Sequence, residues 1–457
     1  MTATFWIKAL QMLASLSLLV FVHELGHYTF ARLSGTKVEK FYLFFNPWFT
    51  MFKYKPKPKP VKEGETPKAS WRDTEYGIGW LPLGGYCSIA GMVDETKSAK
   101  DLGDKVQPWE FRAKPAWQRL LIMIGGVLFN FLAAIAIYAG MVYVLGEQFI
   151  PFKNATEGMA FCESAHKIGF VDGDIPLSAD GKELYYYSTE DLQAMLTAKQ
   201  VTVLRGTDTV RISIPKDFIF TANKDAEEGQ LFMSYRLPVV VSQTQPNMGA
   251  EKAGLKSGDR IIGVNSVSTR EYVSFTEQLQ SNKDKTVTIH FLRDGRQDSA
   301  RVAVDDAGKI GILLTEPEKV YETITLNYSF FRSIPRGIEM GWEKLSGYVS
   351  QLKYVFTADG AKSLGGFGSI GSIFPESWDW IAFWSITAFL SVILAVMNIL
   401  PIPILDGGYV LFLLIEVFTG WKPSEKFMNV ALNIGFYLLI ALLLFANGND
   451  IYRFLIK

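Results

Sequence analysis

The chain has 457 residues, 49% of them hydrophobic, with 46 basic and 46 acidic side chains. A net charge of zero argues against a nucleic-acid-binding protein, because such proteins need a basic surface to displace counterions from phosphates. Two cysteines, Cys87 and Cys162, exclude a disulfide scaffold and a four-cysteine zinc module. A mean hydropathy of +0.14 indicates membrane spans combined with water-exposed domains.

Four stretches of the sequence reach the length of about 20 apolar residues that crosses a bilayer. They are Phe5–Phe30, Leu120–Leu145, Trp380–Leu405 and Phe427–Phe445. We expect the first to be retained and not removed as a signal peptide, because no small-residue cleavage site follows it. The fold class is therefore a polytopic α-helical membrane protein with four transmembrane helices, in contact with the lipid bilayer.

The charges of the connecting loops predict the orientation of these spans. The loop 34–118 carries fourteen Lys or Arg against ten Asp or Glu. The positive-inside rule places this loop in the cytoplasm, together with the short turn after the third span. The long segment from about Glu147 to Pro375 is then extracytoplasmic, and both chain ends lie on that side too.

The cytoplasmic loop contains a glycine-rich stretch, Tyr76–Met92, with the sequence YGIGWLPLGGYCSIAGM. Its apolar residues favour strands and predict a β-hairpin. Two interpretations stay open for this hairpin: an edge strand that pairs with an extended peptide, and an ordinary structural hairpin. The alternating Lys55–Pro60 stretch predicts an extended linker.

The extracytoplasmic segment repeats itself. Residues 252–267 read KAGLKSGDRIIGVNSV, and Ala165–Leu184 carries a weaker copy of the same glycine, apolar and Gly-Asp pattern. A helix pattern and two strand patterns follow each copy, which predicts two copies of one α+β module. The AGL-x-x-GD-x-I string resembles bacterial PDZ domains. After the repeat, apolar residues at three- and four-residue spacing over 331–355 predict an amphipathic helix, either on the membrane surface or against the preceding domain.

A candidate metal site lies in the first span, in the sequence His23-Glu24-Leu25-Gly26-His27. Residues i and i+4 share one face of a helix, so both imidazoles can reach one ion, and Glu24 lies beside that face as a candidate general base. The motif is about 27 Å from Phe5 along the helix, near the predicted cytoplasmic boundary. Ionisable groups at that depth are costly and usually functional.

Two histidines leave a catalytic zinc ion short of a third protein ligand. Asp406 is the strongest candidate, because it follows Pro401 and Pro403, which break the third span near the same depth as His27. Glu416 is the competing candidate, ten residues further along the chain.

These motifs together resemble a known family. The HExxH sequence in the first span and Asn398-x-x-Pro401-x-Pro403-x-Leu405-Asp406-Gly407 in a late span resemble the site-2 intramembrane metalloproteases. Two PDZ-like modules between the second and third of four spans are similar to the bacterial regulator of sigma-E protease type. The sequence departs from that pattern at Gly125-Gly126, where a Gly-Pro is common.

The resemblance implies a set of functional residues and a location. Zinc would be held by His23, His27 and Asp406, with Glu24 as general base, in a bacterial inner membrane. The modules would be periplasmic and the active site near the cytoplasmic side. A membrane-associated β-hairpin would add a strand to the substrate, and two asparagines would hold the unwound helix. The implied substrate-binding residues are Gly77, Gly79, Leu81, Gly84, Gly85, Tyr86, Asn130 and Asn398.

The sequence thus predicts a zinc-dependent endopeptidase that cuts transmembrane segments. The resemblance suggests a truncated anti-sigma factor and signal-peptide remnants as substrates, and we expect the PDZ pair to exclude substrates with large external domains. Two alternatives are a PDZ-bearing membrane scaffold or chaperone with a vestigial metal site, and a metal-dependent enzyme acting on lipid.

The predicted segments are 1–33, 117–147, 378–419 and 426–447 for the spans, 34–116 for the loop, 150–238 and 239–318 for the modules, and 325–360 for the amphipathic helix.

Overall fold

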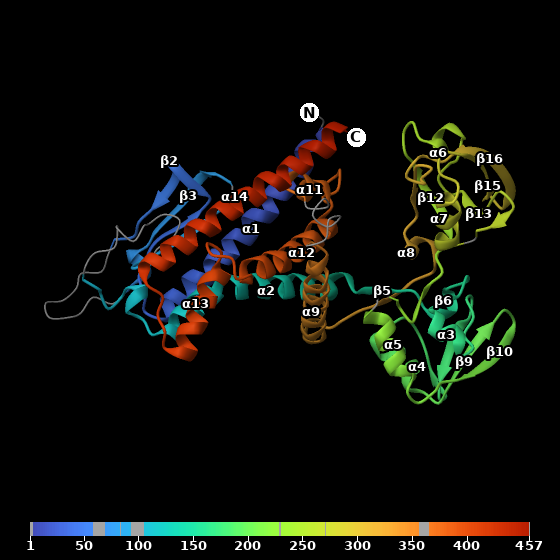
Figure 1. Ribbon diagram of the computed structural model, residues 1–457, viewed down its shortest axis with the longest axis horizontal. Coiled ribbons are helices and arrows are strands. Elements are labelled where there is room, and N and C mark those ends of the chain that lie inside the picture. Colours follow the sequence, from blue (N-terminus) through green and yellow to red (C-terminus); the bar gives the residue numbers. More distant parts are fainter. Residues whose placement is uncertain are drawn as a thin grey trace. The chain divides into compact units, whose positions relative to one another are not determined.

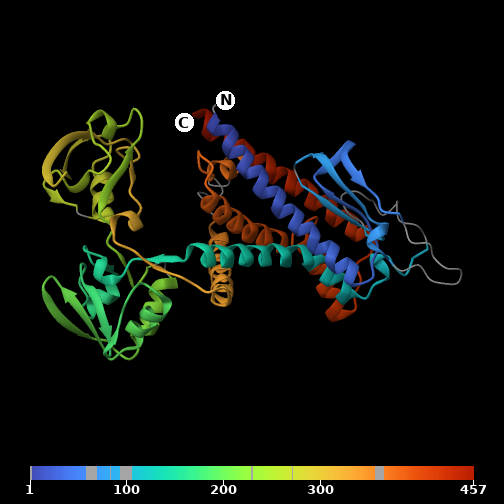
Figure 2. The same ribbon diagram turned by 180° about the vertical axis from the view of Figure 1, so that it is seen from behind.

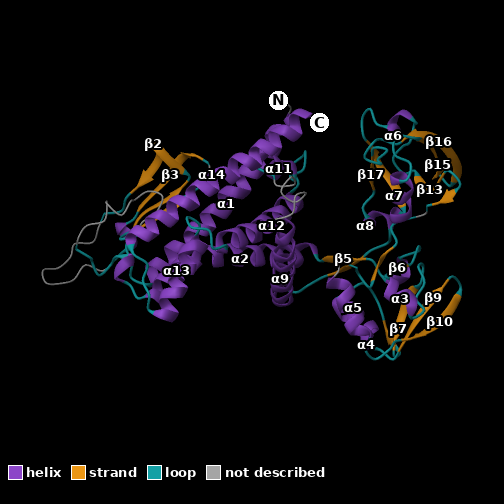
Figure 3. Ribbon diagram, viewed as in Figure 1, coloured by secondary structure: helices purple, strands orange, loops and turns teal. Residues whose placement is uncertain are grey.

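The computed structural model describes residues 3–57, 69–82, 84–92, 105–227, 230–269, 271–355 and 365–456. They form two compact units, which Figures 1 and 3 show as ribbons. The helical unit comprises Met1–Leu145 and Asn327–Lys457, and the modular unit comprises Gly146–Leu326. The end of the predicted linker, 58–60, lies outside the described residues, as does Leu83 in the glycine-rich stretch.

Within the described residues, the helical unit contains four helices long and apolar enough to cross a membrane, as predicted. They are α1 (Ala3–Leu33), α2 (Ala116–Leu145), α12 (Trp380–Ile399) and α14 (Glu425–Ile456). The third is shorter than predicted. It ends at Ile399, and a separate helix α13 (Asp406–Thr419) follows, because Pro401 and Pro403 lack the N–H groups that would continue α12.

Small polar side chains hold three of these helices together. The hydroxyl groups of Thr387 of α12 and Ser15 of α1 are hydrogen-bonded at 3.0 Å, and Ser391 Oγ donates to the Asn130 carbonyl of α2 at 2.7 Å. All four residues are fully buried. Hydrogen bonds of this kind fix the relative positions of helices where apolar packing alone is not specific, as between membrane helices. The histidine-bearing helix and its two neighbours therefore have a fixed register.

The predicted amphipathic helix is α9 (Phe330–Val355), and it crosses α2 within the helical unit (Figure 2). Gly337 and Gly341 face α2; a Cβ at Gly337 would lie 2.7 Å from the Ala139 nitrogen. The helix leaves apolar side chains such as Phe331 (82% exposed) and Trp342 (63% exposed) outside. Its attachment to α2 is thus shown, and a position on the membrane surface stays a prediction. A short helix α11 (Phe367–Ser372) precedes α12.

The glycine-rich stretch belongs to a four-stranded sheet, and its two strands do not pair with each other, so the prediction of a hairpin within Tyr76–Met92 was wrong. The strands are β1 (Val38–Leu43), β2 (Phe45–Tyr54), β3 (Glu75–Leu81) and β4 (Tyr86–Ile89), in the order β2-β3-β1-β4. Strand β1 lies between β3 and β4, pairing parallel to β3 and antiparallel to β4. Leu81 and Tyr86 therefore end and begin different strands, and β3 is an interior strand.

The two halves of the modular unit, here called the first and second copy, have a similar order of strands and helices, except that α5 (Phe218–Glu227) of the first has no counterpart among the described residues of the second. The first copy contains β6 (Met159–Phe161), α3 (Glu163–Lys167), β7 (Ile175–Ala179), β8 (Lys182–Glu183), α4 (Thr189–Thr197), β9 (Gln200–Arg205), β10 (Asp208–Ser213), α5 (Phe218–Glu227) and β11 (Met233–Tyr235). The second contains β12 (Val239–Thr244), α6 (Gly249–Lys252), β13 (Arg260–Val264), β14 (Val267–Ser268), α7 (Tyr272–Gln280), β15 (Thr286–Arg293), β16 (Arg296–Ala303) and β17 (Ile312–Leu314). The first and last strands of the unit, β5 (Glu147–Phe149) and β18 (Ile324–Leu326), pair with each other, and α8 (Pro317–Val320) precedes β18.

The same ion pair occurs in both copies. Arg205 binds both carboxylate oxygens of Asp174 and donates to the Gly169 carbonyl. Arg293 does the same with Asp259 and the Gly254 carbonyl. In each copy the aspartate belongs to the Gly-Asp motif, and the arginine ends the strand after the helix. The repeat is therefore structural, and the identification of the modules as PDZ domains stays a prediction.

Candidate active site

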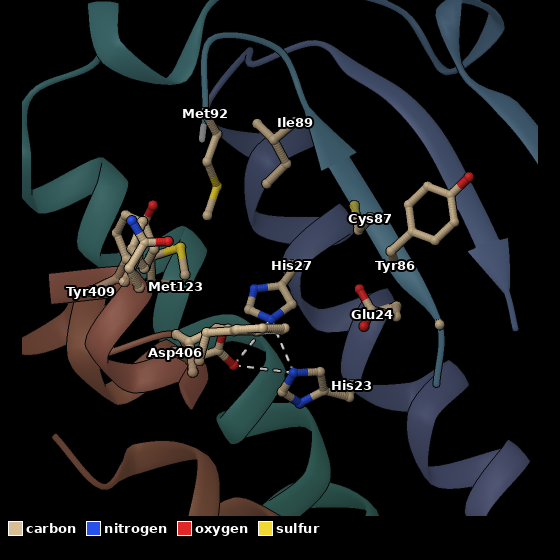
Figure 4. Close-up of a pocket in the computed structure, with 15 residues that line it drawn as sticks. His23, Glu24, His27, Tyr86, Cys87, Ile89, Met92, Met123, Asp406 and Tyr409 are labelled. Carbon is tan, nitrogen blue, oxygen red and sulfur yellow. Dashed lines mark hydrogen bonds and ion pairs between the residues drawn. The ribbon is translucent and has the colours of Figure 1, made fainter. Parts of the chain in front are cut away.

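The HExxH motif lies on one face of α1, and Asp406 at the start of α13 meets it (Figure 4). Asp406 Oδ2 lies 3.1 Å from His23 Nε2 and 3.3 Å from His27 Nε2, and the two Nε2 atoms are 3.2 Å apart. His23 and His27 share one helix face because they are four residues apart. Two distant parts of the chain thus place three metal-ligating atoms in one small triangle.

This triangle has the size that a tetrahedral zinc site requires. Ligands at 2.0–2.1 Å from a tetrahedral ion lie roughly 3.3 Å from one another, close to the three measured separations. Among the described residues, these three form the group that could hold a metal. Asp406 Oδ2 is buried and has no hydrogen-bond donor. Two imidazoles and one carboxylate are a donor set that suits zinc, with the fourth position left for water or substrate.

The orientation of His27 is fixed by the backbone of α2. Its Nδ1 lies 2.9 Å from the carbonyl oxygen of Ile122. A carbonyl only accepts, so Nδ1 carries the hydrogen and donates it, and the lone pair is left on Nε2, the atom that faces Asp406. Hydrogen bonds of this kind orient metal-ligating histidines and raise their basicity.

Glycines allow α1 and α2 to approach each other at this point. A Cβ at Gly126 would lie 2.5 Å from His27 Nε2 and 2.6 Å from His23 Cε1, and a Cβ at Gly125 would lie 2.7 Å from the Phe30 ring. Only a residue without a side chain fits beside the two imidazoles. The Gly125-Gly126 pair therefore gives the histidines their space.

The position of Asp406 follows from the broken third segment. After α12 ends, Ile404 adopts φ +90°, an unusual conformation for a β-branched residue, and α13 begins at Asp406. A Cβ at Gly408 would lie 2.7 Å from the Pro403 Cα, so the loop folds back over the first turn of α13. The Asp-Gly-Gly sequence is thus required for the turn that directs the carboxylate to α1.

Glu416, the competing third ligand, has another partner. Its Oε1 accepts a hydrogen bond from Arg119 Nη2 of α2 at 2.5 Å. Asp406 instead faces both histidines. The geometry therefore favours Asp406.

A cavity of about 250 Å³ opens beside the three ligand atoms. Glu24 lines it and accepts a hydrogen bond from the Cys87 backbone N–H of β4. Figure 4 shows Glu24 on the strand side of the site, with Cys87 and Tyr86 beside it. A Cβ at Gly85 would lie 2.9 Å from Val20 and 3.4 Å from Glu24 Cγ, so the glycine brings β4 close to α1.

Comparison with known families decides the class of this site. The model of peptidase family M50 matches residues 11–58 and 65–442. The chain belongs to peptidase family M50. It is a zinc metalloprotease of the site-2 protease type, which confirms the sequence-based prediction.

Similar proteins cover nearly the whole chain. The regulator of sigma-E protease RseP of Escherichia coli is 28% identical over 469 residues, with 96% of this chain and 97% of that protein covered. Protease RseP of Yersinia pestis is 28% identical over 471 residues, with the same coverage. A Neisseria meningitidis protein whose name describes it as a zinc metalloprotease is 27% identical over 463 residues, again with the same coverage.

The substrate-binding residues implied by the resemblance fall into two groups in this M50 protein. Gly85 and Tyr86 line the cavity, and Gly84 precedes them and packs on the Phe45 ring. The remaining residues do not line the cavity. Gly77 and Gly79 lie in the interior strand β3 next to the Tyr42 ring and the Phe45 carbonyl, Leu81 ends that strand, and Asn398 is half-buried in the last turn of α12.

The strand addition expected at Gly77, Gly79 and Leu81 finds no support in the pairing of β3, and their contact with a substrate stays a prediction. Both edges of β3 are already paired, with β1 and β2, so β3 has no edge left for a peptide. Its glycines accommodate neighbouring strands. Asn130 is fully buried and does not line the cavity, and its contact with a substrate stays a prediction.

Sequence reasoning missed several residues around the metal-ligating atoms. Ile122 orients His27 through its carbonyl, while Met123, Tyr409, Asn433 and Phe436 line the cavity. One signal was present: Ile122, Gly126 and Asn130 follow each other at four-residue spacing and so share one face of α2. The lining residues on α13 and α14 gave no signal, because they are ordinary members of apolar helices.

Proposed function

We propose that this protein is an intramembrane endopeptidase that cuts transmembrane helices of other membrane proteins. The observation that carries the proposal is the placement of His23, His27, Asp406 and Glu24 around one cavity between apolar helices. Charged and metal-ligating groups at such a place are costly unless they serve a reaction. A soluble substrate would not require the site to lie there.

In the proposed site His23, His27 and Asp406 hold zinc and Glu24 is the general base. Zinc at such a site polarises a carbonyl and makes water more acidic. The Glu24 carboxylate takes the proton of the attacking water and passes it to the leaving amide nitrogen. The Cys87 N–H that bonds Glu24 holds the carboxylate on the strand side of the cavity.

A helix cannot be cut while its amides are hydrogen-bonded internally, so the substrate has to unwind. Strand β4 is the end strand of its sheet, and its residues Tyr86, Cys87 and Ile89 line the cavity together with the preceding Gly85. An unwound substrate segment adds to this edge as a further strand, which replaces its lost helical hydrogen bonds. Asn398 is proposed to contact the unwound segment near the end of α12.

The names of the relatives guide the choice of substrate. The Escherichia coli protein is named as a regulator of sigma-E. We propose an anti-sigma factor already shortened by another protease, and remnants of signal peptides, as substrates. We propose that the protein lies in a bacterial inner membrane, with the active site near the cytoplasmic side and the modular unit in the periplasm.

The two modules are proposed to be PDZ-like domains that exclude substrates whose external domain is still large. The predicted topology supports this role, because modules outside the membrane cannot deliver a peptide directly to a site near the cytoplasmic side. Recruitment of a substrate's external tail is the competing role.

The test of the proposed function compares the Glu24→Gln variant with the parent protein in detergent or vesicles. A model transmembrane peptide is the substrate, and zinc content is measured in parallel. We expect stoichiometric zinc and no cleavage in the variant, and zinc with cleavage in the parent. If the parent protein contains no zinc, the result favours a membrane scaffold or chaperone with a vestigial metal site. If the parent hydrolyses lipid but not the peptide, the result favours a metal-dependent enzyme that acts on lipid. Full activity of Glu24→Gln removes Glu24 from the mechanism.

A further inference from the structure

Asn130 lies in the middle of α2, on the side of the His23 ring that faces away from Asp406. It is fully buried, and its side-chain amide lies 3.4 Å from His23 Nδ1, the ring nitrogen that does not face Asp406. The amide nitrogen is the atom closest to Nδ1, and the amide oxygen is buried without a partner. The substrate contact predicted for this residue does not account for that position.

The chemistry of a metal-binding histidine determines which end of the amide must face it. When His23 holds an ion through Nε2, its Nδ1 carries a hydrogen and needs an acceptor. The NH₂ end of Asn130 is a donor and cannot serve. The two ends of an amide have nearly the same shape, so a half-turn about the last side-chain bond places Oδ1 at the same point. Oδ1 lacks a partner in the present orientation, and the half-turn gives it the hydrogen of His23 Nδ1.

We infer that Asn130 is a positioning residue for the metal centre. Its Oδ1 accepts the hydrogen of His23 Nδ1 and so directs Nε2 toward the ion. This inference rests on the proposed zinc-dependent function and deepens it. The same helix orients the other histidine, since the Ile122 carbonyl accepts from His27 Nδ1 at 2.9 Å. One face of α2 thus carries an acceptor for each histidine, with Gly126 between them leaving room for both rings.

The backbone that carries this side chain is itself held in place. The backbone carbonyl of Asn130 accepts from Ser391 Oγ of α12 at 2.7 Å, and both residues are fully buried. This contact holds the backbone of α2 against α12 at Asn130 and so keeps the residue beside His23. Partners of this type typically change metal affinity by about 10- to 100-fold when they are removed.

The experiment measures zinc affinity by competition with a chelator, in a Glu24→Gln background so that proteolysis plays no part. Asn130→Leu keeps the size of the side chain and removes the acceptor, whereas Asn130→Asp keeps it. We expect Asn130→Leu to weaken zinc binding by about 10- to 100-fold and Asn130→Asp to stay close to the parent. The visible spectrum of the cobalt-substituted protein should change in the Leu variant and be restored in the Asp variant.

Controls separate this inference from protein folding and from the proposed function. Ser391→Ala removes the backbone contact but leaves the acceptor, and it should retain most of the zinc affinity. Unchanged zinc affinity in Asn130→Leu overturns the inference, and so does an equal loss in both Asn130 variants, which would indicate packing alone. His23→Ala tests the function separately: if it also keeps full zinc affinity, His23 is no ligand and the proposed metal site fails.

Discussion

Arg119 of α2 and Glu416 of α13 form an ion pair between two helices of the active site, with Nη2 and Oε1 2.5 Å apart. Their side chains are only 10% and 15% exposed. Arg119 also donates to the Lys114 carbonyl and lies over the Phe111 ring. The pair fixes α13 against α2, ten residues after Asp406, and so contributes to the position of the third ligand.

Glu416→Gln should therefore destabilise the protein without removing a ligand. An unpaired arginine is left largely buried, and breaking a buried pair in this way typically costs about 3–5 kcal/mol. Thermal unfolding in detergent should shift to lower temperature while one zinc per chain is retained. The double variant Arg119→Met/Glu416→Met should recover much of the loss. Loss of zinc at unchanged stability would instead make Glu416 a ligand.

Asp406→Ala should lose zinc binding and proteolysis together. The substitution removes one corner of the triangle with His23 and His27. A suitable control is Asp379→Ala, because Asp379 caps α12 through the Ile381 and Ala382 amides and does not line the cavity. Zinc content and peptide cleavage are measured for both variants. Tight, stoichiometric zinc in Asp406→Ala would contradict the assigned ligand set.

Gly126→Ala should impair the metal site through a single methyl group. Its Cβ would lie 2.5 Å from His27 Nε2, too close for any contact, so the imidazole or α2 has to move. Gly140→Ala is the matched control on the same helix, since a Cβ there meets nothing within 4 Å. We expect zinc affinity and cleavage to fall at least tenfold in the first variant and to stay near the parent in the second. Equal zinc affinity and equal cleavage in the two variants would show that α2 can move to accommodate the added methyl group.

The Asp259–Arg293 pair should make the second module sensitive to acid. Burial opposes ionisation of Asp259, but hydrogen bonds from Arg293 and from the Lys256 amide outweigh it and hold the pKa of the carboxyl below its usual value. The pair therefore stabilises the module above the unfolded-state pKa of about 3.9, and this stabilisation is lost as the pH falls through the lower folded-state pKa.

Asp259→Asn should remove this contribution at neutral pH, at a cost of about 2 kcal/mol. Hydrogen exchange of residues 239–314 in the full-length protein measures the effect. The corresponding Asp174→Asn variant should affect the first module and leave the second unchanged. A variant whose exchange matches the parent at pH 7 would show that the pair does not stabilise the module.

A deletion can test whether the modules exclude or recruit substrates. Phe149 of β5 and Ile324 of β18 are directly paired, so an Asn-Gly turn can replace residues 150–323 and leave a two-stranded hairpin. If the modules exclude large substrates, this variant should cut a full-length substrate as well as a shortened one, at rates within a few-fold of each other. If it binds zinc yet no longer cuts the shortened substrate, the modules recruit it.

The sequence by itself determined the elements that depend on local pattern. Apolar stretches of spanning length identified four helices, and the HExxH spacing placed two imidazoles on one helix face. The two prolines before Asp406 marked a broken segment, and the repeated Gly-Asp motif marked two modules. Each of these is a property of neighbouring residues, because helix periodicity, proline geometry and membrane thickness act on a short length of chain.

Only the tertiary structure decided which residues serve the site from a distance. Strand β1 lies between β3 and β4, so the cavity is lined by β4 and the glycines of β3 are interior. Arg119 binds Glu416 and leaves Asp406 to face the histidines, and Asn130 reaches His23 at 3.4 Å. The contacts of Arg119, Asp406 and Asn130 join residues from about 100 to nearly 400 positions apart, and the strand pairs join residues about 35 to 50 positions apart. They depend on how helices cross and strands order themselves, and no local pattern carries that information.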